Sequence, residues 1–219
     1  MDSVEIKLWQ GEITATEADY PQNLGILDAT EQQYAEGIKN EQFRKRYVEI
    51  HARLRRVLGE NVNAAPEHLR IHKAEYGKPF LVDYPDLAFN LSHTANKMVI
   101  VTAYHCDLGV DIEQCTPRKN LAALVDKCFA EEEKTFWQQL PQSQQLRAFY
   151  QFWTRKEAFV KATGRGIALG LNECVINPEK PLEWLRIPNA YGQAGDWLIQ
   201  EIEMGGMVCG AIAFRKRGN

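Results

Sequence analysis

The chain has no long apolar run, no paired-cysteine motif and no strong excess of either charge. Its most apolar stretch, residues 98–104, is far shorter than the roughly 20 residues that a membrane-spanning helix needs. The first ten residues carry acids instead of a basic segment followed by an apolar one, so we expect no signal peptide. These absences predict a cytoplasmic protein with no membrane segment.

Five cysteines, an odd number, occur without a Cys-x-x-Cys pair or the spacing of a metal site. We therefore expect reduced thiols that fill space in the core. The formal net charge of −3 argues against a protein that coats nucleic acid nonspecifically. The chain has 219 residues, of which 45% are hydrophobic, so it is long enough for one large globular domain or two small ones.

Segments with strand and helix character recur in a similar order in the two halves of the chain. Apolar alternation and turn residues predict strands at residues 4–9, 23–27, 87–92, 98–104, 109–113, 173–177, 196–204 and 208–214. Apolar spacings of three and four predict helices at residues 31–58, 121–139 and 146–163. This order indicates two related α/β lobes that divide near residues 104–108, with a ligand cleft where they meet.

Two carboxylates, Asp111 and Glu113, stand two residues apart on a predicted strand. Residues two apart point to the same side of a strand, so these like charges would lie together and repel each other. A divalent cation would balance them, and oxygen ligands favour Mg²⁺ or Ca²⁺. The alternative is a half-exposed strand with two solvated acids.

The helix predicted over residues 146–163 has one acid on its apolar stripe, Glu157, and Gly164 is expected to end the helix. A carboxylate on an apolar face is costly unless it is paired or bound to a metal. Lys161 lies one turn further on, so a buried Glu157–Lys161 ion pair is one interpretation. The other is that Glu157 completes a metal site with the two strand acids, and that Lys161 faces an anion held by the metal.

Other segments offer groups that suit an anion. Ser92 and His93 end a predicted strand in a polar turn, which fits phosphate binding better than nucleophilic catalysis; a plain turn is the alternative. Lys78 is presented by a Gly-Lys-Pro turn, a weak signal when taken alone. Arg46 and Arg53 share one helix face because they are seven residues apart.

Together and in this order, these segments resemble the Sfp-type 4′-phosphopantetheinyl transferases. The matching segments are YGKP at 76–79, FNLSH at 89–93, GVDIE at 109–113, FWTRKEAFVK at 152–161 and ATGRG at 162–166. The resemblance implies an α+β pseudo-dimer with an N-terminal lobe (1–105) and a C-terminal lobe (106–219). Each lobe is expected to pack a small, mostly antiparallel sheet against a long helix.

The resemblance also implies a reaction, in which the 4′-phosphopantetheine arm of coenzyme A moves to a serine of an apo acyl, peptidyl or polyketide carrier protein. Adenosine 3′,5′-bisphosphate is the by-product. The implied metal is Mg²⁺ on Asp111, Glu113 and Glu157. Glu157 and Lys161 would be catalytic: Glu157, or a metal-bound water near it, would accept the serine proton, and Lys161 would stabilise the leaving phosphate. Ile112 stands where some relatives carry a third acid, so a water is expected to complete the metal coordination.

The contacts with coenzyme A are assigned by the same resemblance, except for one that rests on helix geometry alone. They are Arg46, Lys78, Ser92, His93, Asp111 and Lys161, with Arg53 added only because it shares a helix face with Arg46. We expect a monomer that binds carrier proteins and coenzyme A but neither nucleic acid nor membranes.

Two other functions use some of the same residues. A non-catalytic module that binds carrier proteins or coenzyme A would not need three carboxylates and Lys161. A nucleic-acid binder could use the basic residues between 44 and 56, but the net charge and the lack of a recognised RNA- or DNA-binding motif argue against it.

Overall fold

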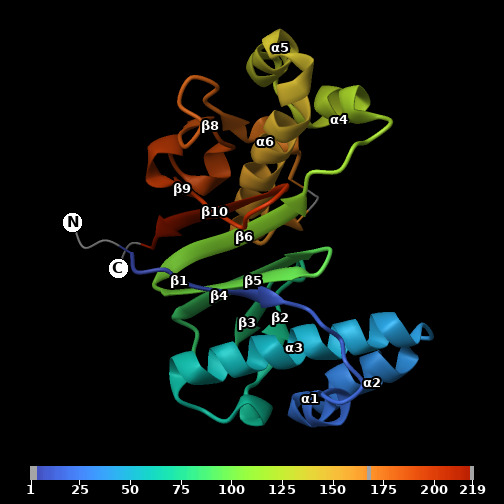
Figure 1. Cartoon of the computed structure of the whole chain (residues 1–219). Coiled ribbons are helices and arrows are strands. Elements are labelled where there is room, and N and C mark those ends of the chain that lie inside the picture. The colour runs from blue at the N-terminus through green and yellow to red at the C-terminus, as the bar shows by residue number, and fades with distance from the viewer. Residues whose placement is uncertain (1–3, 167–168, 218–219) are drawn as a thin grey trace.

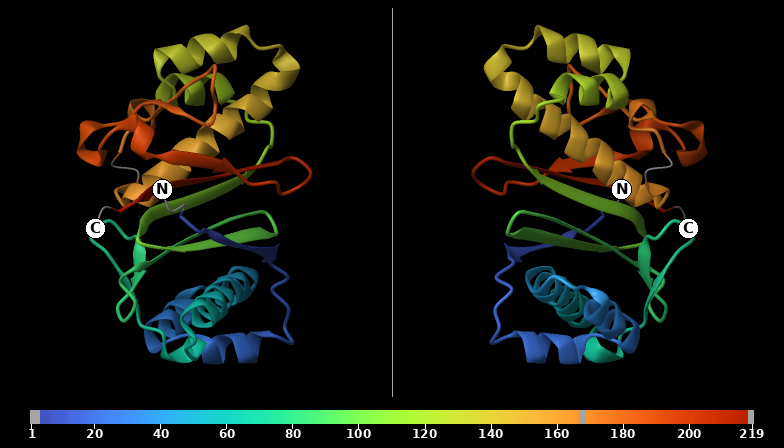
Figure 2. Two further views of the ribbon diagram at one scale, coloured as in Figure 1. Left: turned by 90° about the vertical axis from the view of Figure 1, so that its left-hand side faces the viewer. Right: turned by 90° about the vertical axis from the view of Figure 1, so that its right-hand side faces the viewer.

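The chain folds into an α+β structure in which two antiparallel sheets lie between two groups of helices (Figure 1). The computed structural model describes residues 4–166 and 169–217. Side views keep the same order of layers: helices, sheet, sheet, helices (Figure 2). The predicted α+β class is therefore confirmed. Within the described residues, no helix combines the length and the apolar character needed to cross a membrane.

The first sheet has the strand order β1–β5–β4. Its strands are β1 (Lys7–Glu12), β4 (Leu87–Thr94) and β5 (Lys97–Tyr104). The helices on its side of the molecule are α1 (Tyr20–Ile26), α2 (Ala29–Gly37) and α3 (Glu41–Val62). Ile50 and Leu54 of α3 pack with Phe89 and Ile100 of the sheet in a buried apolar core. The short strands β2 (Ile71–Lys73) and β3 (Pro79–Leu81) form a separate hairpin.

The second sheet has the order β6–β10–β9 and repeats this plan. Its strands are β6 (Cys106–Gln114), β9 (Leu198–Glu201) and β10 (Val208–Lys216). Its helices are α4 (Leu121–Cys128), α5 (Glu131–Gln139) and α6 (Gln142–Thr163). Phe149, Phe152 and Phe159 of α6 pack with Ile199 and Ala213 of the sheet. The strands β7 (Val175–Ile176) and β8 (Trp184–Arg186) pair beside it.

The strands β4 and β6, one from each sheet, are joined by side chains instead of a backbone ladder. Three β4 side chains accept hydrogen bonds from the N–H groups of every second β6 residue: Asn90 from Val110 at 3.0 Å, Ser92 from Ile112 at 3.2 Å, and Thr94 from Gln114 at 3.0 Å. An apolar cluster that includes Val99, Val101 and Ile212 fills the space between the sheets. On this arrangement we propose residues 1–105 and 106–219 as the two lobes.

Buried ion pairs fix the helices within each group. Lys156 of α6 and Glu133 of α5 have fully buried side chains that form an ion pair, and Lys156 also donates to Cys128 O at 3.0 Å. In the other group, the fully buried Arg55 of α3 pairs with Glu31 of α2 at 2.6 Å. Such pairs are costly to break, because removing one partner leaves the other charge buried and uncompensated.

Two helix predictions joined what the structure separates. The helix predicted over 31–58 is α2 and α3, because Asn40 caps α3 by accepting from the Phe43 N–H at 3.0 Å. The helix predicted over 121–139 is α4 and α5. In contrast, Gly164 ends α6 as predicted, with a left-handed φ of 73°.

Strand predictions were right in the middle of the chain and at residues 208–214, which lie within β10. Residues 173–177 and 196–204 contain the shorter strands β7 and β9, and the two predictions before residue 30 were the least accurate. Strands 87–92, 98–104 and 109–113 were predicted close to β4, β5 and β6. Residues 23–27, predicted as a strand, instead lie largely in α1, whose first turn contains Pro21. The first strand is β1, three residues later than predicted.

Candidate active site

Lys161, Asp111 and Ser92 meet where α6, β6 and β4 come together. Lys161 Nζ donates to Asp111 Oδ1 at 2.8 Å, to Ser92 Oγ at 3.1 Å and to the Val110 carbonyl at 3.1 Å. The Ser92 hydroxyl donates in turn to Asp111 Oδ1 at 3.0 Å and accepts from the Ile112 N–H. Ser92 therefore connects the two strands and holds the Asp111 carboxylate at the same time.

Glu113 and Glu157 complete an acidic cluster with Asp111. Burial raises the pKa of Glu157, and the nearby charges of Asp111 and Glu113 raise it further. Burial and then the Asp111 charge likewise raise the pKa of Glu113. The pKa of Asp111 is also raised, because burial outweighs the hydrogen bond and charge of Lys161. The three carboxylates that the sequence singled out are thus close enough to repel one another.

The sequence suggested an ion pair between Glu157 and Lys161, but Lys161 forms a different pair. Lys161 pairs with Asp111, and Glu157 is half-buried on α6. The fully buried charged residue of this helix is the preceding one, Lys156. The apolar periodicity of the sequence did not predict the burial of Lys156, because α6 is buried on more than one side.

The acidic cluster fits a hard cation, although its present geometry is not that of a metal cage. In the described part of the chain, no group of three His, Cys, Asp or Glu side chains is arranged to hold a metal ion. Asp111 Oδ2, however, is buried and has no hydrogen-bond partner among the described residues. An orphaned carboxylate oxygen beside two glutamates with raised pKa values is an oxygen donor set suited to Mg²⁺.

An arginine of α3 and a histidine of β4 extend the site beyond Lys161. Arg46 Nη2 lies 3.5 Å from His93 Nδ1, so these two predicted residues do come together. Burial lowers the pKa of His93, and the charges of Arg46 and Lys161 lower it further. His51 of α3 also contributes to this shift, and the sequence analysis did not select it. A single histidine within a helix carries no pattern that could have identified it.

Two predicted coenzyme A residues make contacts that differ from the expectation. Lys78 Nζ donates to backbone carbonyls, Leu108 O at 3.1 Å and Ala162 O at 2.6 Å. Arg53 lies over the Trp9 ring, 5.2 Å from its centroid, and 3.8 Å from Glu49. The shared helix face of Arg46 and Arg53 therefore does not bring Arg53 to the acidic cluster, and its role as a coenzyme A contact stays a prediction.

A cavity of about 270 Å³ opens beside Lys161. It is lined by the turn at residues 76–79, by Asn90 and Leu91 of β4, and by Gly164 after α6. Lys78 also lines a second cavity, of about 450 Å³, whose lining includes Arg165. Lys161 lines the first of these cavities, and neither cavity is lined by Asp111, Glu113 or Glu157.

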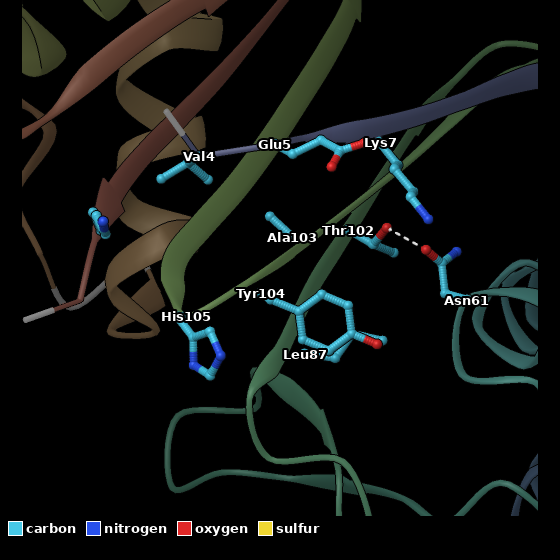
Figure 3. Close-up of a pocket in the computed structure, with 10 residues that line it drawn as sticks. Val4, Glu5, Lys7, Asn61, Leu87, Thr102, Ala103, Tyr104 and His105 are labelled. Carbon is cyan, nitrogen blue, oxygen red and sulfur yellow. Dashed lines mark hydrogen bonds between the residues drawn. The ribbon is translucent and has the colours of Figure 1, made fainter. Parts of the chain in front are cut away.

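Figure 3 shows a different pocket, at the end of β5, with a volume of about 270 Å³. Its lining includes Tyr104, His105 and Thr102, whose hydroxyl donates to Asn61 Oδ1 at 3.1 Å. None of the residues predicted for the active site lines it. The chemistry of this pocket is therefore separate from that of the acidic cluster.

Comparison with known proteins identifies the family. Residues 107–203, which contain the whole acidic cluster and Lys161, match the 4′-phosphopantetheinyl transferase superfamily. The chain is 31% identical over 176 residues to a putative 4′-phosphopantetheinyl transferase of Synechocystis, covering 80% of this chain and 71% of that protein. It is 30% identical over 190 residues to the 4′-phosphopantetheinyl transferase HetI of Nostoc, covering 85% and 80%.

The Sfp enzyme of Bacillus subtilis, also named a 4′-phosphopantetheinyl transferase, is 30% identical over 119 residues, covering 54% of this chain and 52% of that protein. The resemblance to Sfp-type enzymes in the sequence is thereby confirmed. The chain belongs to the 4′-phosphopantetheinyl transferase family.

Proposed function

We propose that this protein transfers the 4′-phosphopantetheine arm of coenzyme A to a serine of an apo carrier protein and releases adenosine 3′,5′-bisphosphate. It does so as a cytoplasmic monomer with Mg²⁺. The observation that carries the proposal is the grouping of Asp111, Glu113 and Glu157 with Lys161, whose side chain lines a cavity. The names of the relatives support the same reaction class.

The three acids would hold the Mg²⁺, whose charge when bound balances that of the coenzyme A diphosphate. The serine oxygen of the carrier forms a bond to the β-phosphorus, and the bond from that phosphorus to the bridging oxygen breaks. The bridging oxygen leaves with adenosine 3′,5′-bisphosphate. Glu157, which lies beside the other two acids, accepts the serine proton.

The remaining residues bind and orient the substrate. Lys161 stabilises the charge that develops on the leaving α-phosphate. Arg46 and His93, which lie 3.5 Å apart, bind the 3′-phosphate of coenzyme A. Ser92 holds Asp111 in place by its hydrogen bond of 3.0 Å.

Mass spectrometry of apo carrier proteins tests this function directly. The full chain is incubated with coenzyme A, Mg²⁺ and a panel of acyl, peptidyl and polyketide carriers. We expect at least one carrier to gain the mass of phosphopantetheine, and we expect the gain to disappear when EDTA removes the metal. Carrier or coenzyme A binding without any mass gain would instead support a non-catalytic binding module.

Replacing Lys161 with Met is expected to lower kcat by about 10²–10³-fold, the loss seen when one preorganised charge-stabilising donor is removed. The aliphatic part of the side chain is retained, so packing beside Ser92 changes little. The matched control is Lys39→Met at an exposed position between α2 and α3. Initial rates of carrier modification at saturating coenzyme A measure the effect. A Lys161→Met rate equal to that of the control would contradict the assignment.

A further inference from the structure

We infer that Lys78 is a positioning residue whose ammonium holds β6, the strand of Asp111 and Glu113, against α6, the helix of Glu157 and Lys161. The inference rests on the proposed function, because it concerns the same site. It differs from the expectation that Lys78 contacts coenzyme A, since it assigns the ammonium to the protein backbone.

The contacts of Lys78 Nζ join the two elements directly. It donates to Leu108 O of β6 at 3.1 Å and to Ala162 O of α6 at 2.6 Å. Leu108 precedes Asp111 by three residues, and Ala162 follows Lys161. An ammonium has three N–H donors, so these two carbonyls occupy most of its hydrogen-bonding capacity. A change in either distance would move Asp111 and Glu113 of β6 relative to Lys161 of α6.

Both acceptors are groups that benefit from a cation. Carbonyls in the last turn of a helix lack intrahelical partners and form the negative end of the helix dipole, so the Lys78 charge stabilises the end of α6. On β6, Lys78 binds the carbonyl of Leu108, and Lys161 binds that of Val110 at 3.1 Å. The two lysines therefore hold alternate carbonyls of the strand that carries the acids.

The stem of Lys78 is fixed as well as its ammonium. Gly164 ends α6 at a φ of 73°, and a Cβ atom added at this glycine would lie 3.3 Å from Lys78 Cδ. The aliphatic stem of Lys78 therefore packs on the end of the helix. The side chain lines both cavities beside the site. A long side chain held at both its stem and its tip is suited to setting a distance.

The surroundings keep Lys78 largely charged at neutral pH. Burial lowers its pKa to about 8, and the nearby Asp107 charge opposes this shift. Burial raises the pKa of Asp107, but hydrogen bonds from Arg217 and Arg215 outweigh this and lower it, so Asp107 stays ionised. Cys106 also faces Lys78, and burial raises its pKa to about 11, so this thiol stays neutral where Lys78 titrates.

The test compares Lys78→Met with Lys97→Met. Lys97 is the matched control because its Nζ also donates to a backbone carbonyl, that of Met204 at 2.6 Å, away from β6 and α6. We expect Lys78→Met to lower kcat at least ~10-fold through misplacement of the acids. We expect its KM for coenzyme A to change by less than about 3-fold, and kcat of Lys97→Met to stay within about 2-fold. A raised KM with an unchanged kcat would show a direct ligand contact and overturn the inference, as would no change in either.

Hydrogen exchange separates this inference from the proposed function, because it needs no activity. Lys78→Met should speed amide exchange in β6 and in the last turn of α6, and Lys97→Met should not. An inactive wild type with this exchange pattern would reject the proposed function alone. Unchanged exchange in an active enzyme would reject the role of Lys78 alone.

If Lys78→Met does not fold, the pH profile gives the answer. The wild-type kcat should fall as the pH rises through about 8, where Lys78 loses its proton. In Lys78→Arg the guanidinium keeps its charge, so this alkaline limb should move to higher pH. An alkaline limb that is the same in both proteins would overturn the inference.

Discussion

Asp111→Asn is expected to lower kcat by at least ~10³-fold, the largest effect on the rate of any substitution considered for this site. Asparagine keeps an oxygen that accepts from Ser92 and Lys161, as Asp111 Oδ1 does at 3.0 and 2.8 Å. It removes the negative charge and replaces the unpartnered Oδ2, the atom best placed to bind a cation. The loss therefore reports on the charge and the metal and not on packing.

The stability of Asp111→Asn should not fall with its activity. Burial raises the pKa of Asp111 above the ordinary value of 3.8, so the charged form costs stability in the folded state at neutral pH. The neutral amide removes this cost but also ends the ion pair with Lys161, and the loss of that pair costs stability. Because the two effects oppose each other, thermal denaturation followed by circular dichroism should give a Tm close to that of the wild type.

The control for this variant is Asp86→Asn, an exposed aspartate whose ion pairing among the described residues is limited to the His105 ring, with Nδ1 at 3.7 Å from Oδ1. Its kcat and Tm should match those of the wild type. A near-normal kcat for Asp111→Asn would disprove the assignment of Asp111 to the metal, and the proposed arrangement of the three acids with it.

Gly109→Ala is expected to have the largest effect on stability, about 3 kcal/mol or more. A Cβ atom on Gly109 would lie 2.1 Å from Ala158 O and 2.4 Å from Ala162 N. Both are backbone atoms inside α6, which cannot move aside as a flexible side chain would. The strand β6 must therefore shift away from the helix, and the Asp111–Lys161 pair should separate.

The destabilisation of Gly109→Ala can be measured as a fall in Tm and compared with a second glycine variant. For a chain of this length, about 3 kcal/mol corresponds to a fall in Tm of roughly 6–12 °C. Gly25→Ala introduces a Cβ with no atom within 4 Å, inside α1, so its Tm should not fall. We expect Gly109→Ala also to lose most of its transfer activity. An unchanged Tm for Gly109→Ala would show that β6 and α6 are not in the tight contact described here.

The sequence predicted best the elements whose local signals agree. Strands β4, β5 and β6 combine apolar alternation with clear turns, and α6 ends at Gly164, so their positions follow from local rules. The break between α2 and α3 was missed because the apolar spacing is almost continuous there. The boundary is marked by Gly37, the last residue of α2, and by Asn40, which caps α3.

For the site, the sequence identified which residues to expect, but it did not predict the contacts of every side chain. The acids were recognisable because like charges on one strand face require compensation. The orientation of long side chains depends on tertiary contacts, and this is why Lys78 reaches carbonyls on β6 and α6 and why Arg53 lies on Trp9. For the same reason, the buried pair of Lys156 and Glu133 could not be predicted from spacing alone.

The double use of the Ser92 hydroxyl has a consequence for how the enzyme is made. One oxygen receives the Ile112 N–H across the junction of the two sheets and donates to Asp111. The acids and Lys161 follow Ser92 in the chain, so during synthesis the first sheet emerges before any of them. A nascent polypeptide whose second sheet has not yet docked therefore has Ser92 without the Asp111 and Lys161 that complete the site.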